Sequence, residues 1–487
     1  VWSLQDQFES QSSSIWPLAF PRTTFTNACR FNDGSSDSLY KTFSGNGNRK
    51  TFTFSAWVKR GIVSSGDHCL IATSVSASDD NTMELFFQGG DKLAVGRYYN
   101  YNLITNALFR DPSAWYHIVL ACDTTQSTAA NRMRLYVNSS EITSFATASY
   151  PSQNDDLPLL AGSQRINIAA QYYTHLSQNT RFLDGYMTEV IMVDGQQLTP
   201  TSFGATNPVT NIWEPIAYTG TYGTNGYKLN FSDSSNLGDD TSGNANDWTV
   251  SNLTSVDQST DTCSNNFCTM NPLCRTNGSF SNGNLELDQN GSTGHTITST
   301  FGVENGKWYW EAKLLNWNSS NSRPMIGVNT GRNSVTGTNE ILGYSGDSDG
   351  IGYNLFGNNV YQNGSIIESS SDMGGSVADN DIYMFALDKD NNKFYIGRNG
   401  TFLNSGDPTT GSTGTGAIGT ISSTKAYFPA TGSNDNSSNS SHNNDWQFNF
   451  GSPVHSISSG NADANGFGNF EYAVPSGYFA LCTKNLA

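Results

Sequence analysis

The feature that most limits the fold is a succession of short, strand-like segments separated by turn residues. In TFTFSAWVKRG (51–61) apolar and polar residues alternate, so that Phe52, Phe54, Ala56 and Val58 share one face. MELFFQGGDKLAVG (83–96) is typical of a hairpin, with Gly-Gly-Asp at its turn. Strands that recur at intervals of about 8–12 residues predict an antiparallel sandwich or barrel.

Strand-like segments resume after a polar stretch, which divides the chain into parts. GKWYWEAKLLNW (306–317) and DIYMFALDKDNNKFYIGRNGTFL (381–403) are the clearest of them. A chain of 487 residues exceeds one ordinary domain. We therefore expect an all-β protein with two antiparallel jelly-roll β-sandwiches in tandem. The predicted parts are an N-terminal arm (1–24), a first sandwich (25–215), an ordered linker (216–284), a second sandwich (285–455) and a C-terminal segment packing on the second sandwich (456–487).

The charge of the chain excludes several classes of partner. The net charge is −17, and only 14% of the residues are charged. Nucleic-acid phosphates and anionic membrane surfaces attract proteins that are rich in Lys and Arg. The sequence contains no run of about 18 apolar residues of the kind that spans a bilayer. We expect neither nucleic-acid binding nor membrane insertion.

Clusters of aromatic and amide residues suggest carbohydrate binding. Sugar sites combine an aromatic ring with a few polar groups that fix the hydroxyls. The candidate ligand-binding residues are Tyr98, Tyr99, Tyr101, Tyr172, Tyr173, Trp317, Tyr344 and Asp347. The alternative for each aromatic residue is packing in a core or at a subunit interface.

Catalytic patterns are weak, and we expect no enzyme activity. The nearest match to a retaining glycosidase is Glu286-Leu287-Asp288, where the third carboxylate of the pattern is missing. Gly414–Gly419 fits a dinucleotide-binding loop in letters alone, because no strand precedes it and no helix follows. We therefore name no candidate catalytic residue, and we expect no cofactor other than a possible calcium ion.

Seven cysteines leave the redox compartment open. Cys29, Cys69 and Cys122 lie in strand-like sequence and are expected to be small buried hydrophobes. Cys263 and Cys268 lie close together in a polar stretch, where a disulfide between them is one candidate and free thiols are the other.

Several motifs carry a resemblance to known domain families. FSAWVKRG, WYHIVLACD, LYVNSSEI and DGYMTEVIMVDGQQLT resemble the laminin-G-like, concanavalin-type jelly roll. GKWYWEAKL, IGV, GYSGDSDGIGYN, DIYMFALDKDNNKFYIGRNG and WQFNFG resemble a SPRY domain. Together these resemblances cover most of residues 25–455. Laminin-G-like domains often hold calcium at their rim, which makes Asp123, Asp184 and Glu189 candidate metal ligands. Asp184 is equally well explained as a turn residue before Gly185.

The order of the two domains is similar to that of structural proteins of marine bacteriophages, especially those that infect cyanobacteria. The linker segments NFSDSSNLGDDTSGNANDWT and DTCSNNFCTMNPL and the later VPSGYFALCTKNL carry this resemblance. In that family the linker usually reads D-T-P-x-N-N-F-x-T-x-N-P. Here Cys263 replaces the proline and Cys268 a small residue, a departure that favours the local disulfide.

The resemblance implies a non-catalytic protein of the virion surface, such as a tail fibre, adhesin or decoration subunit. We expect it to assemble with other virion proteins and with copies of itself, and to recognise host-surface glycan or protein. One alternative is a purely architectural virion subunit without a ligand. A glycan depolymerase and a cell-surface adhesin are two further alternatives.

Overall fold

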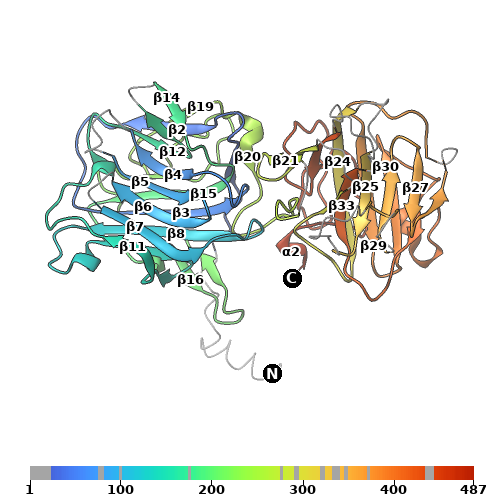
Figure 1. Cartoon of the computed structure of the whole chain (residues 1–487), viewed down its shortest axis with the longest axis horizontal. Coiled ribbons are helices and arrows are strands. Elements are labelled where there is room, and N and C mark those ends of the chain that lie inside the picture. The colour runs from blue at the N-terminus through green and yellow to red at the C-terminus, as the bar shows by residue number, and fades with distance from the viewer. Residues whose placement is uncertain are drawn as a thin grey trace, which may run out of the picture.

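The computed structural model consists of two β-sandwiches side by side (Figure 1). It describes residues 23–74, 82–97, 101–173, 177–274, 278–289, 295–317, 324–331, 341–344, 349–369, 373–433 and 444–486. The predicted N-terminal arm lies outside the described residues except for its last two. Within the described part of the chain no helix is long and apolar enough to cross a membrane.

The first sandwich packs two sheets of eight strands face to face. One sheet has the order β10 (Ser140–Glu141), β9 (Met133–Val137), β8 (Trp115–Asp123), β3 (Thr51–Arg60), β15 (Gly185–Asp194), β1 (Ala28–Phe31) and β20 (Gln258–Ser259), and β18 (Tyr227–Leu229) also pairs with β15. The other has the order β11 (Phe145–Ser149), β7 (Tyr101–Leu108), β6 (Lys92–Arg97), β5 (Glu84–Gln88), β4 (His68–Thr73), β12 (Arg165–Ile168), β2 (Ser38–Thr42) and β19 (Thr249–Ser251).

The alternation in the sequence produces the core between these sheets. Phe52, Phe54, Ala56 and Val58 of β3 all lie in one buried cluster, as their period of two requires. Facing residues of the second sheet, such as Leu85, belong to the same cluster. The predicted all-β, antiparallel class is confirmed.

Two short hairpins lie outside the sheets of the first sandwich. One joins β13 (Gln171–Tyr173) to β14 (Gln178–Thr180), and the other joins β16 (Gly204–Thr206) to β17 (Trp213–Pro215). In Figure 1 the β14 and β16 labels mark opposite ends of the sandwich.

Residues 216–284 differ from the expected linker because they add strands to both sandwiches. β18, β19 and β20 extend the two sheets of the first sandwich, and Trp248 lies in its core. Asp240 accepts hydrogen bonds from the backbone N–H groups of Lys228 and Ser242. The polar side chains of this stretch therefore fix it against the sandwich, although it has no core of its own.

The second sandwich packs a nine-stranded sheet on a six-stranded sheet. The larger has the order β21 (Gly278–Ser281), β22 (Glu286–Gln289), β34 (Asn444–Asn449), β24 (Lys307–Trp317), β29 (Ile382–Asp388), β30 (Lys393–Arg398) and β31 (Thr401–Phe402), with β32 (Gly419–Thr420) beside β30. The smaller has the order β23 (His295–Thr298), β33 (Phe428–Ser433), β25 (Pro324–Asn329), β26 (Ile351–Asn354), β27 (Asn359–Gln362) and β28 (Ser365–Glu368). Trp310, Phe385 and Trp446 are buried between them.

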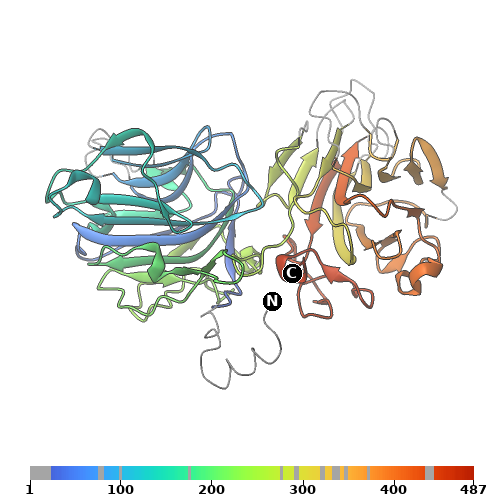
Figure 2. The same cartoon turned by 90° about the horizontal axis from the view of Figure 1, so that it is seen from below.

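The C-terminal segment lies between the two sandwiches and pairs with the second (Figures 1 and 2). β35 (Phe479–Ala480) runs parallel to β24, whereas the other described strand pairs of the sheets are antiparallel. The short helix α2 (Thr483–Leu486) follows, and the Thr483 hydroxyl accepts a hydrogen bond from the Asn266 N–H at 3.0 Å.

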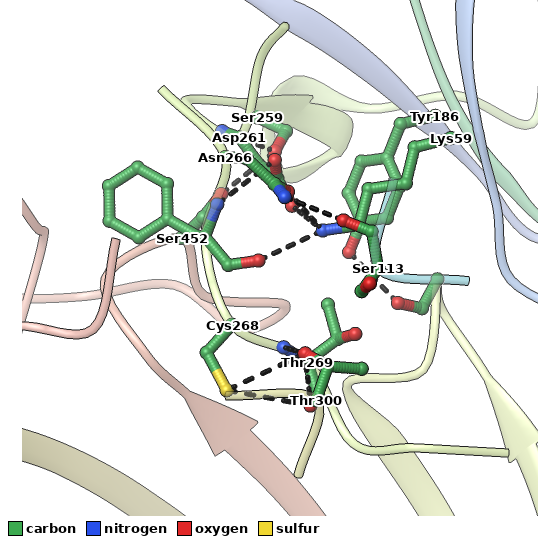
Figure 3. A network of polar contacts seen from close by, with 12 residues as sticks. Lys59, Ser113, Tyr186, Ser259, Asp261, Asn266, Cys268, Thr269, Thr300 and Ser452 are labelled. Carbon is green, nitrogen blue, oxygen red and sulfur yellow. Dashed lines mark hydrogen bonds and ion pairs between the residues drawn. The ribbon is translucent and has the colours of Figure 1, made fainter. Parts of the chain in front are cut away.

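A buried ammonium group links the first sandwich to the segment that leads into the second (Figure 3). Lys59 of β3 donates from Nζ to Asp261 Oδ2 at 2.7 Å, to Asn266 Oδ1 at 2.7 Å and to the Phe267 carbonyl at 2.9 Å. Phe267 packs among aromatic residues of the second sandwich, including Tyr309. Every hydrogen of the ammonium group therefore has an acceptor.

Asp261 is as fully engaged as its partner. Its other oxygen, Oδ1, accepts from Trp115 Nε1 at 3.1 Å and from the Phe267 N–H at 3.2 Å. Burial raises the pKa of Asp261, and the Lys59 ammonium opposes that shift. A second contact crosses the interface where Arg30 Nη1 donates to the Pro453 carbonyl at 3.0 Å.

Candidate functional site

The predicted sugar-binding residues do not form one group. Tyr98, Tyr99 and Asp347 lie outside the described residues, as do the side chains of Tyr101 and Trp317. Tyr344 lies in the second sandwich, where its ring contacts Tyr361 edge-on at 5.0 Å. Tyr172 and Tyr173 lie in the β13–β14 hairpin of the first sandwich. Of these residues, Tyr172 has the most informative surroundings.

The ring of Tyr172 is one of two tyrosine rings that lie against the guanidinium group of Arg165. The Cζ atom of Arg165 lies 4.0 Å from the centre of the Tyr172 ring and 3.9 Å from the centre of the Tyr40 ring. Arg165 belongs to β12 and Tyr40 to β2, which pair in the second sheet. All three side chains are half-buried, so part of each ring remains accessible. We call Tyr40, Arg165 and Tyr172 the ring-arginine cluster.

Strand alternation places the ring-arginine cluster on the outer face of the second sheet. Leu39, Ile166 and Ile168 point into the core between the sheets. Tyr40 and Arg165, their sequence neighbours, must therefore point away from the core. The β13–β14 hairpin lies over this face and supplies Tyr172.

Amide side chains surround the cluster. Arg165 donates from Nε to Asn167 Oδ1 at 2.9 Å and from Nη2 to Asn179 Oδ1 at 3.5 Å. Asn179 in turn donates from Nδ2 to the Ser38 hydroxyl at 3.1 Å. This network joins β2, β12 and β14 and fixes the plane of the guanidinium group. A rigid aromatic surface edged by amides is the arrangement that binds sugar rings.

Three buried polar atoms beside the cluster have no hydrogen-bond partner among the described residues. They are Asn167 Nδ2, Gln171 Oε1 and Thr180 Oγ1, and the residues Asn167 and Gln171 are 0% and 3% exposed. Buried polar groups normally have a partner, and leaving one without costs about 1–3 kcal/mol. A sugar hydroxyl can both accept from an amide N–H and donate to an amide oxygen.

Among the described residues, burial and the two neighbouring tyrosines are what shift the pKa of Arg165. Burial lowers the pKa of the guanidinium group, while the two tyrosines oppose the shift. An arginine still keeps its proton at neutral pH, because its ordinary pKa is far higher. The cluster is therefore cationic in a chain of net charge −17.

The predicted calcium ligands are not brought together, which corrects that expectation. Asp123 is paired with Thr51 at one end of β3, while Asp184 directly precedes Gly185, which is paired with Arg60 at the other end. Ten residues of strand span about 30 Å, far more than two ligands of one ion allow. The described residues contain no group of three or more His, Cys, Asp or Glu that could hold a metal ion.

Each of these carboxylates has a structural partner of its own. Asp123 Oδ1 accepts from the Thr125 N–H at 3.0 Å, as in a turn. Asp184 is buried and accepts from the Gly283 N–H at 3.2 Å, and burial raises its pKa well above the ordinary value. Glu189 lies in a bulge of β15 and forms an ion pair with Lys228 at 3.0 Å.

The predicted disulfide is wrong, because Cys263 and Cys268 are both free cysteines. Their side chains pack in different clusters. Cys263 packs against a cluster of the first sandwich that includes Trp57 and Trp115, whereas Cys268 belongs to the core of the second. The segment between them crosses the domain interface, so proximity in sequence does not bring the two sulfur atoms together.

A pair of carboxyl groups lies on the second sandwich, at the Glu-x-Asp sequence noted above. Asp288 of β22 is directly opposite Asp445 of β34. Burial and the neighbouring Asp288, which shares a hydrogen bond with it, raise the pKa of Asp445 to about 6. Two hydrogen-bonded carboxyls are closer than the about 5–5.5 Å that separates a retaining glycosidase pair.

Sequence reasoning missed Tyr40, Arg165, Asn167 and Asn179. The alternation Arg-Ile-Asn-Ile at 165–168 does predict a strand with two polar residues on one face. That signal is only four residues long and lies between polar loops. Tyr40 and Tyr172 are far apart in sequence, so no local pattern could join them.

No curated protein matches. The structure is similar to the SPRY domain of human HERC1, with 17% identity, a TM-score of 0.28, and coverage of 37% of this chain and 96% of that one. It is similar to a putative carbohydrate binding protein from Bacteroides ovatus (16% identity, TM-score 0.32, 47% of this chain and 58% of that one) and to a heptameric SAP-like pentraxin from Limulus polyphemus (12% identity, TM-score 0.27, 36% and 78%). Residues 33–202, within the first sandwich, match the family model of the concanavalin A-like lectin/glucanases superfamily, which confirms the predicted concanavalin-type first domain.

Proposed function

We propose that this chain is a non-catalytic carbohydrate-binding protein whose ligand contacts the ring-arginine cluster on the outer face of the second sheet. The observation that carries the proposal is the stack of Tyr40, Arg165 and Tyr172, edged by Asn167 and Asn179. The family match of residues 33–202 supports it, because that superfamily includes lectins.

We propose further that the protein belongs to a virion surface, where it contacts other virion proteins, copies of itself and host glycan. The support is the phage-like order of the two domains and the linker segments quoted above. Many copies on one particle would turn individually weak sugar contacts into firm attachment. Locating the chain in an intact particle by cryo-electron microscopy tests this, and a site buried against neighbouring subunits would favour the architectural alternative.

The depolymerase alternative receives less support. Its nearest carboxyl pair, Asp288 and Asp445, shares a hydrogen bond and lies on the second sandwich rather than at the ring-arginine cluster. Release of reducing ends from a bound glycan would contradict the non-catalytic proposal.

Binding of the full chain to a glycan array tests the main proposal. We expect Tyr172→Ala to weaken binding by about tenfold or more, because aromatic contacts dominate such sites. Tyr344→Ala provides the comparison, since this tyrosine lies on the other sandwich and is 43% exposed. Loss of binding in Tyr344→Ala alone would move the site to the second sandwich. Failure of the wild-type chain to bind any glycan would overturn the proposal.

A further inference from the structure

The two tyrosines restrict how a ligand can approach Arg165. With ring centres 3.9 Å and 4.0 Å from Cζ, both faces of the guanidinium plane are covered. The accessible direction is the edge of that plane, where the N–H bonds point. Nε and one hydrogen of Nη2 are used by Asn167 and Asn179. The Nη1 group has no partner among the described residues, so the Nη1–Nη2 fork remains open.

Arg165 differs in one respect from another arginine on the same face. Arg181 also lies over an aromatic ring, that of Phe86, at 5.3 Å. It donates from Nη1 to both carboxylate oxygens of Glu84 at 2.6–2.7 Å and lies 3.4 Å from Asp67. Arg165 has no carboxylate within 4.0 Å among the described residues, although the chain is strongly acidic. Its charge is held in place without a counter-charge.

A buried donor beside Arg165 points to the same kind of ligand. Asn167 Nδ2 is unpartnered among the described residues, and the same side chain already accepts from Arg165 Nε through Oδ1. Two neighbouring donors, one of them cationic, match an acceptor group that carries negative charge. Gln171 Oε1, in the β13–β14 hairpin, also has no partner among the described residues and matches a hydroxyl donor.

From these contacts we propose that the glycan bound at the ring-arginine cluster is anionic, and that the Nη1–Nη2 fork of Arg165 binds its carboxylate or sulfate group. This inference rests on the proposed carbohydrate-binding function and narrows its ligand class. The guanidinium fork matches carboxylate and sulfate-like oxyanions with two parallel hydrogen bonds. The tyrosines keep it in that orientation, so little ordering is needed on binding.

The test measures binding of the full chain to glycans in matched pairs. Each uronic-acid or sialic-acid glycan is paired with its carboxyl-reduced or desialylated form, and each sulfated glycan with its desulfated form. We expect a preference of about tenfold or more for one anionic form, the size expected of a charge-assisted hydrogen bond. Comparing the carboxylate pairs with the sulfate pairs shows which anion is preferred. Added salt should reduce the preference.

Variants of the two arginines provide the matched control. Arg165→Gln should abolish the preference for the anionic form, and Arg165→Lys should retain only part of it, because an ammonium group cannot form the fork. Arg181→Gln should keep the preference, since Arg181 is already engaged by Glu84 and Asp67. Thermal melting confirms that each variant is folded. If Arg165→Gln does not fold, Arg165→Lys takes its place in the test.

The outcomes separate this inference from the function on which it rests. Equal affinity for the anionic and neutral forms, or an unchanged preference in a folded Arg165 variant, overturns the anionic ligand and leaves carbohydrate binding intact. Absence of binding to every glycan overturns carbohydrate binding and the anionic ligand with it.

Discussion

The domain interface and the outer face of the first sandwich each hold a cation, and the two are held in opposite ways. Lys59 at the interface is fully buried, and its three hydrogens reach Asp261, Asn266 and Phe267. Arg165 on the outer face is half-buried and covered by two rings, and among the described residues its hydrogen-bond acceptors are neutral amides. One cation is neutralised within the chain, and the other is oriented without being neutralised.

The difference indicates that the charge of Lys59 stabilises the fold, whereas the charge of Arg165 is available to a ligand. A buried ammonium group with a carboxylate partner contributes to the fold, because removing either partner leaves an uncompensated charge out of water. A guanidinium group stacked between rings keeps its charge and its N–H edge available. Changes at the interface should therefore affect stability, and changes at the outer face should affect binding.

The largest effect is expected from Asp261→Ala. It leaves the Lys59 ammonium buried without its carboxylate, which costs about 3–5 kcal/mol of unfolding free energy. Urea unfolding followed by tryptophan fluorescence measures this. The double variant Lys59→Met, Asp261→Leu removes both charges and should recover part of the loss, because Trp115 Nε1 and the Phe267 N–H still lose their acceptor. If Asp261→Ala lowered the unfolding free energy by less than about 1 kcal/mol, the contrast between the domain interface and the outer face would disappear.

A smaller effect on stability is expected from Arg165→Met, which keeps the aliphatic stem. Two partly exposed cation–π contacts contribute about 1–2 kcal/mol together. Glycan binding should decrease in the same variant. If unfolding free energy fell as far as in Asp261→Ala, Arg165 would be a structural residue and the comparison would fail.

The smallest effect is expected from Asp445→Asn on the second sandwich, where two like charges face each other. The folded pKa of Asp445 is raised to about 6, above its ordinary value, so its contribution to stability is present at low pH and lost as pH rises through about 6. The asparagine cannot ionise. The melting temperature of the wild type should therefore fall relative to Asp445→Asn, by about 1–2 °C between pH 5 and pH 7.5.

Two comparisons check that small shift. Asp288→Asn should weaken the pH dependence of the wild type, because it removes the neighbouring charge while the burial that chiefly raises the pKa of Asp445 remains. Melting temperatures of wild type and variant that change in parallel across this pH range would contradict a proton shared by Asp445 and Asp288.

The sequence predicted the architecture well where apolar residues alternate. Phe52, Phe54, Ala56 and Val58 gave the core face of β3, and the aromatic run at 306–317 became β24. Residues 216–284 looked like a linker because they contain few apolar residues. Strands β18, β19 and β20 are held instead by pairing with strands formed earlier in the chain, as β18 pairs with β15. Pairing between distant strands has no local signature.

The candidate site was predictable only in part, for the same reason. The aromatic and amide composition of 171–173 singled out Tyr172 as a candidate, but its partners lie on strands that only the fold brings near. The carboxylates chosen as calcium ligands lie apart instead, Asp123 at the end of β8, Asp184 just before β15 and Glu189 within β15. Cys263 and Cys268 were separated by the domain boundary that runs between them.

The parallel pairing of β35 with β24 has a consequence for synthesis on the ribosome. β20 completes the first sheet of the first sandwich with residues 258–259, long before residues 479–480 emerge. The first sandwich can therefore fold during translation, whereas Trp308 and Tyr309 of β24 gain their β35 partners only after residues 479–480 have been made. A chain that ends near residue 470 would contain a finished first domain and a second domain in which Trp308 and Tyr309 of β24 lack this partner, a short unpaired edge that favours aggregation.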